Sequence, residues 1–122
     1  MKYTNPIVKG FYPDPSVCFA NGKFYLVCSS FQYFPGVPLF ESDDLVNWTV
    51  HGTIFVASAA GAAKWGNNSW APAVAYKEIA GKMKFFVYFA NSGNGIGLAV
   101  AKKICELHGG DIKIKYTYGT IK

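Results

Sequence analysis

The clearest pattern in the N-terminal half is a pair of short apolar segments separated by Asn21-Gly22. Residues 16–20 and 23–28 flank this dipeptide, whose two residues suit the positive φ angles of a tight hairpin turn. The second segment is apolar at consecutive positions, as in a strand that is covered on both faces. Residues 16–28 therefore predict a β-hairpin within a larger sheet.

Two further strands are predicted after this hairpin. Residues 37–42 follow a Pro-Gly turn, and residues 48–54 follow an Asp-Asp turn. Together with the hairpin they predict a four-stranded antiparallel sheet. The segment 57–68 is rich in Ala, Gly and Asn without a clear periodicity, and it predicts a loop.

A second hairpin of the same character is predicted in the C-terminal half. Residues 71–77 and 82–90 flank Ala80-Gly81, and the second of these segments again lacks a polar face. Two similar hairpins in one chain indicate a repeated sheet module of the kind found in β-propellers.

The pattern changes after residue 95. Apolar side chains recur at i, i+4 and i+7 within residues 96–107, with lysines between them, and a Gly-Gly pair follows. This pattern predicts a helix with a glycine C-cap. Residues 95–101 alone fit a buried strand equally well, and the length of the segment favours the helix. Residues 111–116 alternate and predict a short final strand, so the predicted fold class is mainly β with a C-terminal α-helix and strand.

Composition places these elements in one small globular domain. The chain has 122 residues, of which 51% are hydrophobic, 17% aromatic and 16% charged, unlike a disordered segment. Its apolar runs are much shorter than the roughly 20 residues of a membrane-spanning helix, so no membrane partner is expected. The N-terminus lacks the apolar segment of a secretory signal, and a cytoplasmic location is expected.

The positive charge predicts a solvated lysine surface. Twelve Lys against seven Asp and Glu give a net charge of +5, and the excess is concentrated in residues 102–122. That segment lacks the interleaved aromatic residues of a nucleic-acid surface, so nucleic acid is not expected as a partner. Cys18, Cys28 and Cys105 are odd in number and widely spaced, which predicts buried free thiols and neither a metal site nor a cofactor.

Several motifs resemble one enzyme family in register. They are Asn-Pro at residues 5–6, Gly-Phe-Tyr-Pro-Asp-Pro-Ser at 10–16, Ser-Ser-Phe-Gln-Tyr-Phe-Pro-Gly-Val-Pro at 29–38 and Asp-Leu-Val-Asn-Trp at 44–48. They resemble the start of glycoside hydrolase family 43, the β-xylosidases and α-arabinofuranosidases built on a five-bladed β-propeller. Residues 64–97 are also similar to this family. The resemblance implies a partial five-bladed propeller of about two antiparallel blades.

The resemblance also implies roles for three residues. Inverting glycosidases use one carboxylate to deprotonate water and a carboxylic acid about 6.5 to 9.5 Å away to protonate the leaving oxygen. Asp14 matches the family's general base, and its two flanking prolines favour an extended backbone that fixes the carboxylate at the inner end of a strand. An ordinary turn aspartate is the alternative. Phe31 and Trp70 match aromatic positions that line the sugar pocket, with core packing as the alternative.

The family's remaining catalytic groups, an Asp that tunes the acid and the acid Glu itself, have no matching motif. Glu41, Glu78 and Glu106 lie outside such a motif and are interpreted as surface charges. The expected function is hydrolysis of xylosyl or arabinosyl linkages with inversion, weak or inactive in this chain, with a pentose-containing oligosaccharide as partner. The alternatives are a non-catalytic carbohydrate-binding fragment and an inert fusion product.

Residues 93–122 resemble a different family. The run Gly-Asn-Gly-Ile-Gly-Leu-Ala-Val-Ala-Lys-Lys that begins at Gly93 is similar to the second glycine box of sensor histidine kinases, which binds phosphates at a helix N-terminus. A kinase fragment that binds ATP is therefore a second alternative, although the family's other nucleotide motifs are missing. The chain is interpreted as a chimera, with a glycosidase segment at 1–92 and a kinase-like tail at 93–122. Open sheet edges would favour self-association.

Overall fold

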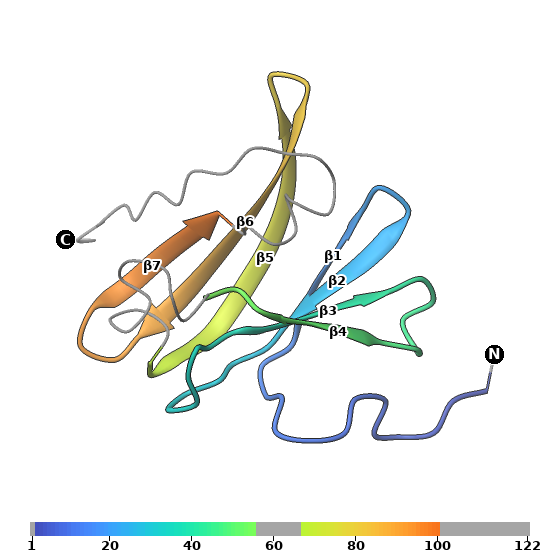
Figure 1. Cartoon of the computed structure of the whole chain (residues 1–122), viewed down its shortest axis with the longest axis horizontal. Helices are drawn as coiled ribbons and strands as arrows, with labels where there is room; N and C mark the ends of the chain where they lie inside the picture. Colours follow the sequence, from blue (N-terminus) through green and yellow to red (C-terminus); the bar gives the residue numbers. More distant parts are fainter. Residues whose placement is uncertain (1, 56–66, 101–122) are drawn as a thin grey trace.

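The chain forms two antiparallel β-sheets in a computed structural model that describes residues 2–55 and 67–100 (Figure 1). The first sheet has the order β1 (Ser16–Ala20), β2 (Lys23–Val27), β3 (Pro38–Ser42) and β4 (Thr49–Thr53). The second sheet has the order β5 (Ser69–Ile79), β6 (Lys82–Asn91) and β7 (Gly95–Val100). The two sheets correspond to the predicted pair of antiparallel blades, and the mainly β fold class is confirmed.

Both predicted hairpins are confirmed, with the predicted turn residues. β1 and β2 are joined at Asn21 and Gly22, whose φ angles are 51° and 80°. β5 and β6 are joined at Ala80 and Gly81, whose φ angles are 52° and 69°. Two central residues with positive φ give the turn a twist that matches the two strands, which is why such short sequences fix the strand register.

β2 is apolar on both faces because the first sheet is covered on both sides. Tyr25 and Val27 point into the main core between the two sheets, while Leu26 and Cys28 point the other way. The N-terminal segment and Trp48 cover this second face. The main core also contains buried side chains of β3 and of both long strands of the second sheet, namely Leu39, Val74, Phe85, Val87 and Phe89.

The helix predicted from residue 96 is wrong for residues 96–100, which belong to β7. β7 pairs with β6 from Asn91↔Gly95 to Phe86↔Val100. A short apolar run fits a helix or a strand equally well. Residues 96–100 form a strand because the free edge of β6 offers hydrogen-bond partners for their backbone N–H and C=O groups.

Other predicted elements lie outside the described residues: the rest of this helix, the strand at 111–116 and most of the loop at 57–68. Within residues 2–55 and 67–100 there is no helix that could cross a lipid bilayer.

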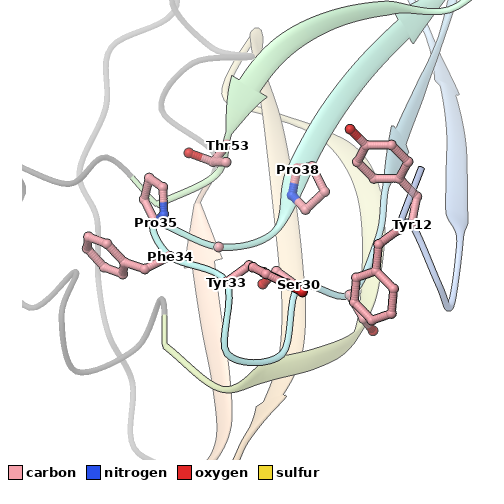
Figure 2. A pocket seen from close by; sticks show the side chains of 10 residues that line it. Tyr12, Ser30, Tyr33, Phe34, Pro35, Pro38 and Thr53 are labelled. Carbon is pink, nitrogen blue, oxygen red and sulfur yellow. The ribbon is translucent and has the colours of Figure 1, made fainter. Parts of the chain in front are cut away.

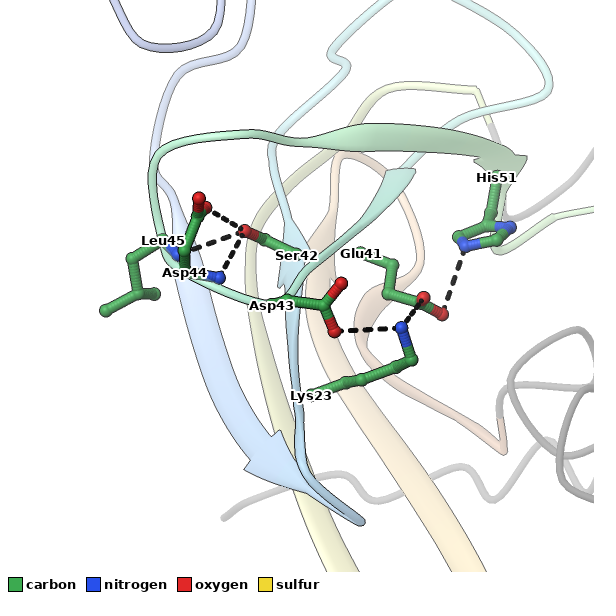
Figure 3. Close-up of polar contacts among 7 residues, drawn as sticks. All are labelled: Lys23, Glu41, Ser42, Asp43, Asp44, Leu45 and His51. Atoms are coloured by element: carbon green, nitrogen blue, oxygen red, sulfur yellow. Dashed lines mark hydrogen bonds and ion pairs between the residues drawn. The ribbon is translucent and has the colours of Figure 1, made fainter. Parts of the chain in front are cut away.

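The loop between β3 and β4 is organised by Asp44, and Figure 3 shows the hydrogen bonds that the Ser42 hydroxyl forms with Asp44 and with the N–H of Leu45. The Asp44 carboxylate accepts hydrogen bonds from the Asn47 N–H at 2.7 Å, the Asn47 side-chain amide at 2.6 Å and the Val46 N–H at 2.9 Å. These bonds, the Asn47 N–H first, hold the pKa of Asp44 well below its usual range. Figure 3 also shows the Lys23 ammonium group between the carboxylates of Glu41 and Asp43. Its hydrogen bonds to these two groups, the one to Glu41 first, raise the pKa of Lys23 above its ordinary value.

Gly97 is a position where even one methyl group should destabilise the fold. Gly97 lies opposite Phe89, and an added Cβ would lie 2.7 Å from Cε2 of that ring. Phe89 is held in place by an edge-to-face contact with Phe55 at 5.1 Å. We expect Gly97→Ala to lower the free energy of unfolding by about 1–3 kcal/mol in urea titrations. The substitution should cost less in a Phe89→Leu background, and strict additivity of the two changes would contradict the contact.

The Asp44 hydrogen bonds predict a pH dependence of stability. Because the folded-state pKa lies below the ordinary value of 3.8, the stabilisation is present above that value and is lost as the pH falls through the folded-state pKa. We expect the free energy of unfolding to decline below about pH 4, and to decline less steeply in Asp44→Asn, where this group no longer titrates. Parallel curves for the two proteins would contradict the lowered folded-state pKa of Asp44.

Candidate functional site

The two sheets are joined along a seam, which we define as residues 13–16, 29–31 and 69–71. The backbone N–H groups of Ser30 and Phe31 both donate to the carbonyl oxygen of Ser69, at 3.2 and 2.9 Å. The N–H of Ser29 donates to the carbonyl oxygen of Pro13 at 2.8 Å. These bonds bring together the three segments that contain Asp14, Phe31 and Trp70, the residues selected from the sequence.

The carboxylate of Asp14 is attached to the seam through Ser29. The Ser29 hydroxyl donates to Oδ2 of Asp14 at 2.6 Å and accepts a hydrogen bond from the N–H of Ala71 at 2.7 Å. Ser29 is fully buried, whereas Asp14 is exposed. The second carboxylate oxygen, Oδ1, has no hydrogen-bond partner among the described residues. The arrangement thus fixes one oxygen and leaves the other free to meet water.

The extended backbone predicted for Asp14 is wrong, because its φ angle is 52°. Aspartate tolerates this left-handed region better than most residues since its short side chain can hydrogen-bond nearby. The resulting turn between the two prolines directs the carboxylate to Ser29. Phe31 and Ala71, also in the seam, have positive φ angles of 47° and 46°. Non-glycine residues in this region cost free energy, and they cluster at functional sites.

The two aromatic candidates lie at the seam and outside both core clusters. Phe31 is half-buried, and its ring centroid is 6.2 Å from that of Phe11. Trp70 precedes Ala71 and is 41% exposed. The structure therefore brings Asp14, Phe31 and Trp70 to one region, through hydrogen bonds of their immediate neighbours.

Sequence reasoning missed the polar residues that support the seam. Ser69 is buried within the seam and Asn91 is buried beside it. The Asn91 side-chain amide donates to the Ser69 hydroxyl at 3.3 Å and to the Asn67 carbonyl oxygen at 2.7 Å. The Asn94 side chain donates to Asn91 Oδ1 at 2.6 Å. A signal was present in the sequence: Ser29 and Asn91 each directly follow a long apolar run, where a buried polar residue needs partners.

Beside the seam lies a pocket of about 280 Å³ (Figure 2). In Figure 2, Tyr12 lies on one side of it and Phe34, Pro35 and Thr53 lie on the opposite side. Neither Asp14, Phe31 nor Trp70 lines this pocket. Ser29 does, so a single side chain separates the pocket from the Asp14 carboxylate.

No second carboxylate faces Asp14 in the part of the chain that the structure describes. Glu41 binds Lys23 at 2.8 Å and His51 at 3.2 Å, and it lies opposite Tyr25 on β2, which precedes Ser29 by four residues or about 13 Å of extended chain. Glu78 lies seven residues beyond Ala71 on β5, about 23 Å along the strand. Glu106 is outside the described residues. Glu41 and Glu78 therefore lie farther from the Asp14 region than the roughly 6.5 to 9.5 Å expected between two catalytic carboxyl groups.

The cysteines near the seam are not suited to nucleophilic chemistry. Burial, with a smaller contribution from the charge of Asp14, raises the pKa of Cys28 to about 11. Burial alone raises the pKa of Cys18 to about 11. Thiols with such pKa values stay protonated at neutral pH, and thiols are weak nucleophiles in that form. Among the described residues, no three His, Cys, Asp or Glu side chains gather into a group that could hold a metal ion.

Known proteins with similar sequences include enzymes named arabinoxylan arabinofuranohydrolase and β-xylosidase. An arabinoxylan arabinofuranohydrolase from Paenibacillus polymyxa is 43% identical over 109 residues, which cover 72% of this chain and 17% of that protein. An enzyme of the same name from Bacillus subtilis is 44% identical over 109 residues, covering 72% of this chain and 21% of that protein. The chain thus spans about a fifth of the length of these relatives.

Solved structures show the same similarity. The crystal structure of a glycoside hydrolase family 43 arabinoxylan arabinofuranohydrolase from Bacillus subtilis, in complex with cellotetraose, superimposes with a TM-score of 0.65 and 41% identity. The match covers 80% of this chain and 25% of that one. The fold of the described residues is therefore part of a larger fold in that enzyme.

The resemblance of residues 93–122 to a histidine-kinase glycine box is not supported. Gly95–Val100 is a strand, and the model of one glycosidase family extends through this segment to residue 115. The division of the chain at residue 92 stays a prediction. The family model, described as glycosyl hydrolases family 43, matches residues 3–115 and so nearly the whole sequence, which shows that the chain belongs to this family.

Proposed function

We propose that the seam is the water-activating part of a glycosidase site that acts on xylosyl or arabinosyl linkages, with Asp14 as the general base. The observation that carries this proposal is the buried Ser29 hydroxyl, which holds Oδ2 of Asp14 and the N–H of Ala71 at the same time. The names of the relatives support the choice of a pentose-containing oligosaccharide as the ligand.

In the proposed mechanism, each oxygen of Asp14 has a distinct task. Oδ2 is fixed by Ser29, and Oδ1 accepts the proton of a water molecule. The water oxygen attacks the anomeric carbon from the face opposite the leaving group while the glycosidic bond breaks, which inverts the configuration. The leaving oxygen then needs a proton from a carboxylic acid about 6.5 to 9.5 Å away. No described residue is placed to supply this proton, and no acid motif of the family was found in the sequence, so we expect hydrolysis by this chain to be slow.

Phe31 and Trp70 supply the proposed contacts with the sugar. Trp70 is exposed and adjacent to Ala71, whose N–H is bound by the hydroxyl that holds Asp14. Flat aromatic rings suit the apolar C–H faces of a sugar, and the partly exposed indole of Trp70 is offered for such a contact one residue away from Ala71.

Non-catalytic binding of the same saccharides is the second candidate function. It is favoured by the positions of Glu41 and Glu78, both far along their strands from Asp14. The two candidates differ in one measurable respect, since binding needs the aromatic rings whereas hydrolysis also needs the carboxylate.

Asp14→Asn should separate these two candidates. Asparagine keeps the shape and the oxygen that accepts from Ser29 but cannot take a proton from water. We expect hydrolysis of an aryl β-xyloside or an aryl α-arabinofuranoside to fall at least about a hundredfold, with the affinity for xylotriose unchanged. Asp43→Asn, which alters an exposed carboxylate on another loop, is the control and should retain the wild-type rate.

Equal hydrolysis by wild type and Asp14→Asn would exclude the base role. If the wild type does not hydrolyse either substrate but xylotriose changes its tryptophan fluorescence, and Trp70→Ala abolishes this change, the chain is a binding module. The absence of both hydrolysis and binding would exclude both candidates.

Ser29→Ala tests whether the seam depends on one hydroxyl. The substitution removes both the acceptor of the Ala71 N–H and the donor to the Asp14 carboxylate, so we expect a loss of about 1–3 kcal/mol in the free energy of unfolding. Hydrogen exchange measured by NMR should be faster at the Ala71 amide than in the wild type. Ser92→Ala, in the exposed β6–β7 turn, is the matched control and should change stability by less than about 0.5 kcal/mol. Equal effects of the two substitutions would contradict the bridging role of Ser29.

A further inference from the structure

Strand β5 contains a β-bulge where it meets the seam, and a buried side chain outside the seam holds this bulge in place. We propose that this side chain, Asn91, is a positioning residue for the general base. Its action on Asp14 passes through the bulge and the Ser29 hydroxyl. The catalytic role of the assignment rests on the proposed function, whereas the structural coupling between Asn91 and Asp14 does not.

The bulge is visible in the register of β5 and β6. Trp70 pairs with Ala90. The next pair is Ala73 with Tyr88, so two residues of β5 lie opposite one residue of β6. The second of these two residues is Pro72, which has no N–H for a strand ladder and is tolerated at such irregular positions. We refer to residues 70–73 as the bulge. A bulge interrupts the ladder, bends the strand and re-aims its groups.

The bulge directs one backbone N–H of β5 toward the base. Ala71 has a φ angle of 46°, and its N–H donates to the Ser29 hydroxyl at 2.7 Å. The same hydroxyl donates to Oδ2 of Asp14 at 2.6 Å. Hydrogen bonds weaken steeply when their geometry changes. A small displacement of the bulge would therefore reorient the Ser29 hydroxyl and weaken its bond to the carboxylate.

Both ends of the bulge are held by side chains. After the bulge, the N–H of Val74 donates to the Ser16 hydroxyl at 3.1 Å. Before the bulge, Asn91 lies opposite Ser69, the residue that precedes the bulge. The Asn91 amide donates to the Ser69 hydroxyl at 3.3 Å and to the Asn67 carbonyl oxygen at 2.7 Å. Asn91 therefore fixes the segment that enters the bulge, and Ser16 fixes the segment that leaves it.

An asparagine suits this position because its donors and its acceptor all have partners. Asn91 is only 4% exposed, and a buried amide is costly unless it is paired. Its N–H groups bind residues 67 and 69, while its Oδ1 accepts a hydrogen bond from the Asn94 side chain at 2.6 Å. The bond from Asn94 also fixes the orientation of the amide, since the reversed amide would turn its donors toward another donor. A buried network with all members paired favours a single rigid arrangement.

Asn91→Ala tests the coupling, with Phe85→Leu as its control. Both residues are buried in β6, but Phe85 packs against Tyr25 in the main core, six residues before Asn91. By hydrogen exchange NMR we expect the Ala71 amide to exchange roughly tenfold faster in Asn91→Ala, beyond any change that a lower free energy of unfolding produces at other buried amides. Phe85→Leu should show no such local excess at Ala71.

The carboxyl carbon of Asp14 gives a spectroscopic readout of the same coupling. In ¹³C NMR at one fixed pH, its resonance should move in Asn91→Ala in the same direction as in Ser29→Ala. Both substitutions weaken the hydrogen bond from the Ser29 hydroxyl to Oδ2. Phe85→Leu should leave the resonance at its wild-type position. Where the aryl substrates are hydrolysed, kcat should fall roughly tenfold in Asn91→Ala and stay near the wild-type value in Phe85→Leu.

Asn94→Ala provides the same test if Asn91→Ala does not fold. It removes only the donor to Asn91 Oδ1, and Asn94 is a half-buried turn residue, so the fold should persist. Exchange at Ala71 should become faster by a smaller factor than in Asn91→Ala. Ser92→Ala is the control in the same turn, because alanine keeps the backbone N–H of residue 92 that donates to the Asn68 carbonyl oxygen.

The outcomes separate this proposal from the proposed function. If neither Asn91→Ala nor Asn94→Ala changes the exchange of Ala71 and the resonance of Asp14 more than its control does, the assignment of Asn91 is overturned. If both readouts respond and the wild type hydrolyses no aryl substrate, the coupling is confirmed and the base role of Asp14 fails. If both readouts respond while kcat stays at the wild-type value, Asn91 is a structural residue and the positioning role is wrong.

Discussion

The structure of the seam depends on one buried hydroxyl group with two partners in distant parts of the chain. Ser29 lies 15 residues after Asp14 and 42 residues before Ala71, and its oxygen binds both. The Ser69 carbonyl oxygen accepts hydrogen bonds from two N–H groups of the segment that follows β2, and it lies in the same seam. A buried polar group is costly without partners, so each of these contacts restricts the relative placement of the two sheets.

The core explains why the same seam can also carry exposed functional groups. Large side chains from both sheets, such as Tyr25 and Phe85, meet edge to face at 5.1 Å and fill the space between the sheets. Burial of these rings gives a large hydrophobic stabilisation. Residues at the seam can therefore adopt positive φ angles and leave a carboxylate oxygen unbound, because the packing elsewhere offsets the cost.

Local features of the sequence predicted most of the fold. The two hairpins depend on turn residues and apolar runs that are adjacent in the chain, and both were predicted correctly. β7 was missed because its state depends on the free edge of β6, which a local pattern does not contain. The predicted backbone at Asp14 failed because the rule for residues before proline omits the long-range bond to Ser29.

Only those residues of the site that belong to motifs of the family were predicted from the sequence. Asp14, Phe31 and Trp70 were selected by resemblance, whereas Ser29 was missed because its role comes from two long-range contacts. The pocket combines Phe11 and Tyr12 with a loop about 20 residues later, and no periodicity relates these two segments. The cytoplasmic location, the absence of a nucleic-acid partner and the self-association stay predictions.

One face of the second sheet carries the proposed sugar contact as part of a larger apolar row. Cross-strand pairing places Trp70 beside Ala90 and Ala90 beside Ile96, and Tyr88 shares this side of β6. Trp70, Tyr88 and Ile96 are all exposed. The indole proposed to hold the sugar therefore belongs to a strip of exposed apolar side chains that crosses all three strands of the sheet.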